Sequence, residues 1–102
     1  MEKTINILAV GRDAAILEVI ERLINAHEGW HATTAATEQE AIGAFEAKAY
    51  TIVFVSAGFS AAEEETLKEK LTRLDPRVTV TRHYGGGSGL LENEILGILA
   101  TK

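Results

Sequence analysis

Apolar residues alternate along this chain between two kinds of spacing. Short apolar runs at residues 5–10 and 51–55 are too short for helices and predict strands. The unbroken apolar character of the second run predicts burial on both faces. Residues 30–35 carry a more mixed strand pattern, which predicts a place near the edge of a sheet. Residues 77–84 complete a set of four expected strands.

Between these runs the apolar residues adopt a helical spacing. Asp13 is the expected N-cap of a first helix and Gly29 its expected stop. Thr37 and Ser60 each stand three residues before a glutamate, which is the capping-box pattern of a helix start. A last helix is expected from about Leu90. The inward-facing helix residues are expected to be Ile16, Leu17, Ile20, Leu23, Ile24, Ala41, Ile42, Phe45, Ala49, Leu67, Leu71 and Leu74.

Four strand–helix units with short connections predict an α/β fold: one open, doubly wound, mostly parallel sheet with helices on both faces. Four strands are expected and a fifth is left open. The most apolar strands, the first and the third, should be central neighbours, and the length suits a single domain spanning residues 1–102. Ligands of such sheets bind beyond the carboxyl ends of the strands. The residues expected there are Gly11, Arg12 and Asp13 after the first strand, Ser56, Ala57 and Gly58 after the third, and the segment from Thr81 to Tyr84 at the fourth.

Composition narrows the functional classes. A net charge of −5 with scattered basic residues argues against nucleic acid as a direct partner. The absence of cysteine excludes disulfides, thiolate catalysis and cysteine metal sites. No segment approaches the ~20 apolar residues of a membrane span, and the N-terminus does not have the pattern of a signal peptide. A cytoplasmic protein with no membrane partner is therefore expected.

The order and spacing of these elements resemble the receiver domain of bacterial response regulators over roughly residues 4–83. "INILAVGRDAAILEVIERLI", "EQEAIGAFEAKAYTIVFVS" and "LKEKLTRLDPRVTV" carry the likeness, which implies a flavodoxin-like scaffold. In that family an acidic pair after the first strand holds magnesium, an aspartate ends the third strand and accepts phosphate, and a Ser or Thr ends the fourth. The matching positions here are Gly11 and Arg12 with Asp13 beside them, Ser56, and Thr81.

The sequence thus resembles the family in its scaffold and lacks the residues that bind magnesium and accept phosphate. Magnesium needs several oxygen ligands, and Arg12 places a cation beside Asp13. The hydroxyl of Ser56 cannot replace a carboxylate as phosphoacceptor without strong activation. The fifth strand and its lysine have no match, since "GGGSG" leads directly into the last helix. Ser56 is best explained as a strand-end hydroxyl bonded to nearby backbone.

These departures predict a pseudo-receiver, a module of the two-component signalling type that is not an enzyme. It is expected to hold no metal and no cofactor, and not to be phosphorylated by the aspartyl mechanism of phosphorelays. Protein–protein contacts, with a partner protein or in a homodimer, would then carry its function.

A small-molecule or nucleotide-phosphate-binding domain is the alternative interpretation. The glycine-rich segment Gly85, Gly86, Gly87, Ser88 and Gly89 follows a strand and precedes a helix, an order that cradles phosphate in nucleotide folds. It lacks a lysine, and Glu92 and Glu94 in the following turns would repel an anion. A structural turn is the simpler interpretation. The acidic run at residues 63–65 is likewise interpreted as a solvated first turn that suits the helix dipole.

The final helix is expected to form an interface. At ~100° per residue its apolar arc is about 240° wide, more than one sheet face can cover. A homodimer or a partner helix would cover the surplus, and the alternative is burial of both flanks against the third helix. An exposed fourth strand would offer a second place for a symmetric contact. The residues expected at the interface are Leu90, Leu91, Ile95, Leu96 and Leu99.

Overall fold

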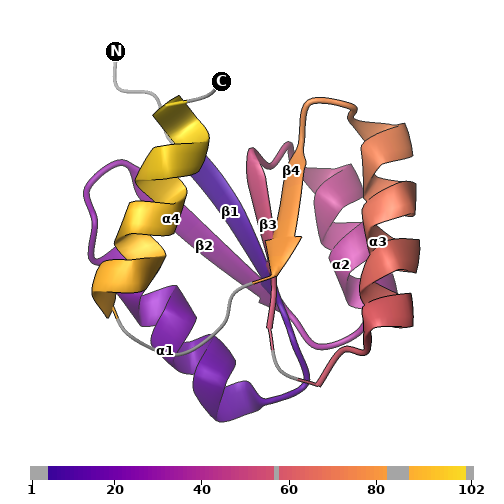
Figure 1. Ribbon diagram of the computed structural model, residues 1–102, viewed down its shortest axis with the longest axis horizontal. Helices are drawn as coiled ribbons and strands as arrows, with labels where there is room; N and C mark the ends of the chain where they lie inside the picture. The colour runs from indigo at the N-terminus through magenta and orange to yellow at the C-terminus, as the bar shows by residue number, and fades with distance from the viewer. Residues whose placement is uncertain (1–4, 57, 83–87, 101–102) are drawn as a thin grey trace.

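The computed structural model describes residues 5–56, 58–82 and 88–100, which form four successive strand–helix units (Figure 1). The order of elements is as predicted. The strands are β1 (Ile5–Val10), β2 (Trp30–Ala35), β3 (Ile52–Val55) and β4 (Thr79–Arg82). The helices are α1 (Ala14–Asn25), α2 (Glu38–Ala47), α3 (Ala61–Leu74) and α4 (Ser88–Ala100).

The strands form one parallel sheet in the order β2-β1-β3-β4. This confirms that the first and third strands are central neighbours and that residues 30–35 lie at an edge. β4 begins two residues later than expected, because a turn in which the Asp75 carboxylate accepts the N–H of Arg77 precedes it. Residues 83 and 84 of the expected strand lie outside the described residues. The part of the chain that the structure describes contains no fifth strand.

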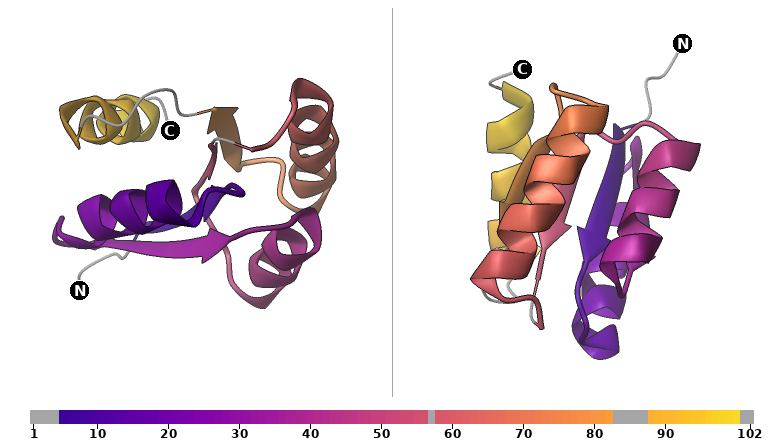
Figure 2. Two further views of the ribbon diagram at one scale, coloured as in Figure 1. Left: turned by 90° about the horizontal axis from the view of Figure 1, so that it is seen from below. Right: turned by 90° about the vertical axis from the view of Figure 1, so that its right-hand side faces the viewer.

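Helices cover both faces of the sheet, as a doubly wound fold requires (Figure 2). Alternate residues of β1 point to opposite faces, so that Ile7 packs beneath α1 and α4 while Leu8 packs beneath α2 and α3. All four residues of β3 are fully buried. The unbroken apolar run at β3 therefore marks a strand with two covered faces, as predicted.

Side-chain caps place the helix starts that follow the strands. The Asp13 carboxylate accepts two N–H groups from the first turn of α1. Ser60 and Glu63 form the predicted capping box at α3. At α2 only half of the predicted box forms: the Thr37 hydroxyl accepts the N–H of Glu40, but the Glu40 carboxylate bonds the N–H of the residue before Thr37.

Three details of the sequence prediction were wrong at helix ends. Gly29, the expected stop of α1, lies in the turn before β2, and the helix already ends at Asn25. Ala49 is exposed, because Lys48 is extended and ends α2 before it. Leu74, the last residue of α3, was expected to face inward, and it is 49% exposed.

Candidate functional site

The edge of the sheet at the carboxyl ends of the strands, where ligands of such folds bind, is called the crevice below. It is built first from β1 and β3. Val10 and Val55 are paired, so the residues that follow them, Gly11 and Ser56, leave the sheet side by side. Ser56 is only 1% exposed, and both its N–H (2.7 Å) and its Oγ (3.1 Å) donate to the carbonyl of Val10. The serine hydroxyl thus bonds nearby backbone, as interpreted from the sequence.

Arg12 spans this crevice from the β1–α1 connection. Its Nη1 donates to the carbonyl oxygen of Gly58 at 2.6 Å. The guanidinium also makes two parallel hydrogen bonds to Glu63, Nη1 to Oε1 at 2.9 Å and Nη2 to Oε2 at 2.5 Å. The guanidinium carbon lies 4.5 Å from the centre of the Phe59 ring, within cation–π range. One side chain therefore ties the connection after β1 to the connection after β3.

Arg12 and Glu63 each favour the charged form of the other. The hydrogen bonds from Arg12, followed by the backbone N–H of Ser60, lower the pKa of Glu63 to about 2. The bond to Glu63 in turn raises the pKa of Arg12. The two side chains remain 47% and 41% exposed, so solvent screens the attraction between them. Both groups are charged at neutral pH.

The absence of a side chain at Gly58 allows Arg12 to pack directly against the backbone of this residue. Its φ of 100° is a conformation that residues with a Cβ rarely adopt. A Cβ built on Gly58 would lie 2.6 Å from the Cβ of Arg12, far inside contact distance. A glycine at this position is therefore a structural requirement of the arginine bridge.

A second arginine closes the same region from β4. Arg82 Nε donates to Glu64 Oε1 at 2.6 Å, and Arg82 Nη2 donates to the carbonyl of Phe59 at 2.8 Å. These side chains are 20% and 24% exposed, so this pair is better shielded than the Arg12 pair. The interpretation of residues 63–65 as a solvated first turn was therefore wrong for Glu63 and Glu64, which both bind arginines. The available signal was that each arginine stands at or just after the end of a strand.

Asp13 and Thr81, two further positions expected at this edge from the sequence, do not take part in the arginine contacts described above. The Asp13 carboxylate, which the resemblance placed near magnesium, is engaged in capping α1. Thr81 pairs with Phe54, and Arg82 pairs with Val55, the last residue of β3. Arg82 therefore stands level with the end of the central strand, one residue beyond Thr81. Of the residues expected at this edge, the structure brings together Gly11, Arg12, Ser56, Gly58 and Arg82.

The donor set of the crevice does not fit the magnesium of receiver domains. Magnesium needs near-octahedral oxygen ligands. Here the nearby carboxylates of Asp13 and Glu63 are bonded to helix N–H groups and to a guanidinium, and the hydroxyl of Ser56 is bonded to backbone. Among the described residues, no three His, Asp or Glu side chains are grouped so that they could hold a metal ion.

The glycine-rich segment can be located only in part. Gly85, Gly86 and Gly87 lie outside the described residues. Ser88 and Gly89 already belong to α4, which begins two residues before the expected start at Leu90. The predicted anion-binding loop therefore stays a prediction.

The final helix lies on the same sheet face as α1. Ile95 is fully buried in the cluster beneath α1 and α4, which corrects its place among the interface residues. Leu99 packs partly against the same cluster, whereas Leu96 is 47% exposed. The backbone of α4 includes Leu90 and Leu91, whose side chains lie outside the description. Because α4 shares its sheet face with α1, the alternative of burial against the third helix was wrong.

Within the described part of the chain, no helix has the length and apolar character needed to cross a membrane.

Comparisons with known proteins identify the architecture. A CheY-like receiver domain of a response regulator from Methylobacillus flagellatus matches with a TM-score of 0.76 at 15% identity, over 94% of this chain and 99% of that one. A LuxR family DNA-binding response regulator from Silicibacter pomeroyi matches with a TM-score of 0.79 at 17% identity, over 96% and 92%. A CheY-like receiver domain protein from Methanospirillum hungatei matches with a TM-score of 0.69 at 25% identity, over 96% and 76%.

No protein-family model matches the chain, and no curated protein matches its sequence. The structural matches confirm the predicted fold, an open parallel α/β sheet of the receiver-like, flavodoxin-like type.

Proposed function

We propose that this domain is a pseudo-receiver, a non-enzymatic signalling module that acts through protein–protein contacts and is not phosphorylated by the aspartyl mechanism. The observation that carries the proposal is the Arg12 guanidinium, which bridges the crevice to Glu63 and to the carbonyl of Gly58. In receiver domains the corresponding position belongs to the acidic pair that holds magnesium. A cation bound to a carboxylate in its place opposes binding of a second cation.

Ser56 supports the same conclusion. A nucleophilic hydroxyl needs an adjacent base and an approach path for the electrophile. The Ser56 hydroxyl is 1% exposed and donates its proton to a backbone carbonyl, which is not a base. Phosphoryl transfer to this position would require the strand ends to move apart.

A switch needs two conformations of comparable free energy. Arg12 and Arg82 each attach a strand end to α3 or to the loop before it, so the surface around this loop is held in one arrangement. Such a module would present a constant binding surface, and its output would depend on its abundance and on its partners.

The outward side of α4 is a surface suited to a protein partner. Its exposed residues within the described side chains are Asn93, Leu96, Gly97 and Ala100, none of them charged. The exposed sides of the other helices carry many charges, including Glu18 and Arg22 on α1. These described exposed residues, with one leucine among them, fit a packed helix of a partner protein better than they fit a polyanion.

Incubation with acetyl phosphate and magnesium tests the proposal. Intact mass spectrometry should show no added mass of about 80 Da, the increment of one phosphoryl group, while an authentic receiver domain in the same reaction acquires it. An adduct on Ser56 or Asp13 would refute the proposal. The triple variant Gly11→Asp, Arg12→Asp, Ser56→Asp is expected to gain magnesium affinity, since it restores the acidic oxygen ligands.

A thermal-shift panel of nucleotides addresses the alternative function. A ligand that binds only the folded chain raises its melting temperature. The pseudo-receiver proposal predicts no shift. A shift that disappears when the residues from Gly85 to Gly87 are replaced by alanine would favour the nucleotide-phosphate-binding domain instead.

A further inference from the structure

The edge strand β2 directs alternate backbone groups away from the sheet. The carbonyls of Gly29 and Ala35 accept N–H groups from β1 and from the residue after it, at 2.8 and 3.0 Å. Odd-numbered residues of this segment therefore pair with β1, and the even-numbered residues Trp30, Ala32 and Thr34 direct their N–H and C=O groups outward. Unpaired groups of this kind make an edge strand a template for pairing with another chain.

The side chains of β2 do not discourage such pairing. Its six residues, WHATTA, include a tryptophan and two threonines, which favour strands, and no Lys, Arg, Asp, Glu or Pro. Segments of this length, with strand-favouring side chains and low charge, are prone to associate edge to edge. β4, at the other end of the strand order, has only four residues and ends in Arg82. Short or charged edge strands resist pairing.

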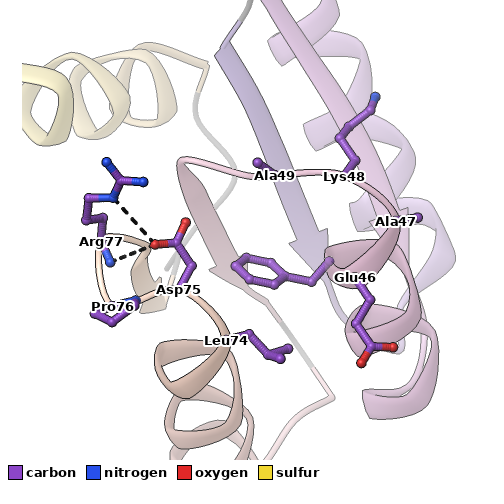
Figure 3. Close-up of a pocket in the computed structure, with 9 residues that line it drawn as sticks. Glu46, Ala47, Lys48, Ala49, Leu74, Asp75, Pro76 and Arg77 are labelled. Carbon is purple, nitrogen blue, oxygen red and sulfur yellow. Dashed lines mark hydrogen bonds and ion pairs between the residues drawn. The ribbon is translucent and has the colours of Figure 1, made fainter.

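Other parts of the surface carry charged side chains. The open hollow of about 720 Å³ between the ends of α2 and α3 is lined by two acids, Glu46 and Asp75, and by two bases, Lys48 and Arg77 (Figure 3). Charged groups keep a surface hydrated and limit association. Because β2 carries none, protection of its edge has to come from outside the strand.

Asn25, the last residue of α1, lies against the middle of this edge. Its Oδ1 accepts the outward N–H of Ala32 at 2.9 Å. Ala32 is only 4% exposed, so its N–H needs a partner within the protein. The outward N–H of Trp30 donates to the carbonyl of His27 at 3.2 Å, and the rings of these two residues are stacked with their centroids 3.6 Å apart. Two of the three outward N–H groups of β2 are thus bonded by the end of α1 and the turn that follows it.

We infer that Asn25 closes the β2 edge against pairing with the β2 strand of a second copy of the chain. A two-fold axis perpendicular to the sheet would set the two strands antiparallel, with the outward N–H and C=O groups of each copy facing those of the other. Such pairing needs the N–H of Ala32, which the Asn25 side chain holds. Because β2 has no acidic or basic side chain, two copies can approach there despite a net charge of −5 on each chain. The role of Asn25 is independent of the crevice and of the proposed function.

Two substitutions of Asn25 test the inference. Asn25→Ala removes the oxygen acceptor and leaves the best helix former at the end of α1, so the β2 edge opens while the helix is kept. By light scattering at about 100 µM, well above a micromolar Kd, its average molar mass should be at least about twice that of the unmodified chain. Asn25→Asp keeps an oxygen acceptor and should have the mass of the unmodified chain.

A proline shows whether this association uses the β2 edge. The N–H of Thr34 points outward, so Thr34→Pro removes no hydrogen bond to β1 and obstructs pairing along the edge. Added to Asn25→Ala, it should restore the mass of the unmodified chain. Association that Thr34→Pro leaves unchanged would overturn the inference. So would an Asn25→Ala variant that is folded by circular dichroism and has the mass of the unmodified chain at every concentration.

Amide hydrogen exchange of the unmodified chain gives a result that does not depend on the folding of any variant. The N–H groups of Ala32 and Thr34 face the same side of β2, and among the described residues only that of Ala32 meets a side-chain acceptor. After correction for intrinsic rates, the Ala32 amide should exchange at least about tenfold more slowly than the Thr34 amide. Equal rates would refute the hydrogen bond from Ala32 to Asn25, and with it the inference.

Discussion

Arg12 and Glu63 are joined by two parallel hydrogen bonds of 2.9 and 2.5 Å, although 51 positions separate them in the chain. Glu63 also serves the capping box of α3, so one carboxylate both starts a helix and closes the crevice. The bond between these residues determines how the crevice responds to pH and to mutation.

The first prediction concerns acid stability. A carboxyl whose folded pKa is lowered contributes stability above its unfolded pKa and loses that contribution as pH falls through the folded value. For Glu63 these values are 4.5 and about 2. Arg12→Met should therefore lower the melting temperature at neutral pH, and the difference from the unmodified chain should shrink as pH falls from about 5 to about 2.

Thermal unfolding across this pH range provides the measurement, and Arg22→Met is the control. Arg22 and Glu18 form a fully surface-exposed pair within α1, with side-chain exposures of 74% and 69%. Removal of that arginine should have a much smaller effect. An Arg12→Met difference that is constant with pH would show that the arginine stabilises the fold through packing on Phe59 and not through its charge.

The second prediction concerns Gly58. Gly58→Ala should destabilise the domain by roughly 1–3 kcal/mol, because alanine disfavours the local φ and its Cβ would collide with that of Arg12. Gly43→Ala is the matched control, since a Cβ at that position within α2 meets nothing within 4 Å. That change should stabilise the helix by about 0.5–1 kcal/mol. Urea unfolding of both variants checks the two signs, and a neutral Gly58→Ala would contradict the close approach.

The third prediction concerns the buried hydroxyl. Ser56→Ala should cost only about 0.5–1.5 kcal/mol, because the carbonyl of Val10 keeps the N–H of residue 56 as a donor. Ser56→Asp should cost more than about 2 kcal/mol, since it places a carboxylate at a buried position beside that carbonyl oxygen. Denaturant unfolding compares the two variants. Equal stability of the two variants would contradict the expected cost of burying a carboxylate at this position.

The fourth prediction separates two neighbours on α4. Ile95→Ala should cost about 2–5 kcal/mol, because Ile95 is fully buried over the sheet and its truncation leaves a cavity. Leu96→Ala should change stability by no more than about 0.5 kcal/mol in the monomer. Urea unfolding at low protein concentration provides both values. A large cost for Leu96 that grows with concentration would instead place a subunit contact on α4.

The sequence alone determined the elements of this protein and the order of its two central strands. Backbone geometry imposes a period of two on strands and 3.6 on helices, so local spacing was enough to locate β1, β3 and their neighbours. Helix caps such as Asp13 and Ser60 act within one helical turn, so they could also be predicted from the sequence.

The tertiary structure alone decided which charges meet. No local pattern relates Arg12 to Glu63 or Arg82 to Glu64, because these pairs form only when parallel strands bring distant connections to the same edge of the sheet. It also decided the position of α4. The apolar face of β3 beside α1, including Phe54, would otherwise face water, and Ile95 covers it. The position of the last helix therefore follows from the need to bury that face of the sheet. The sequence of the helix itself does not specify which face it covers.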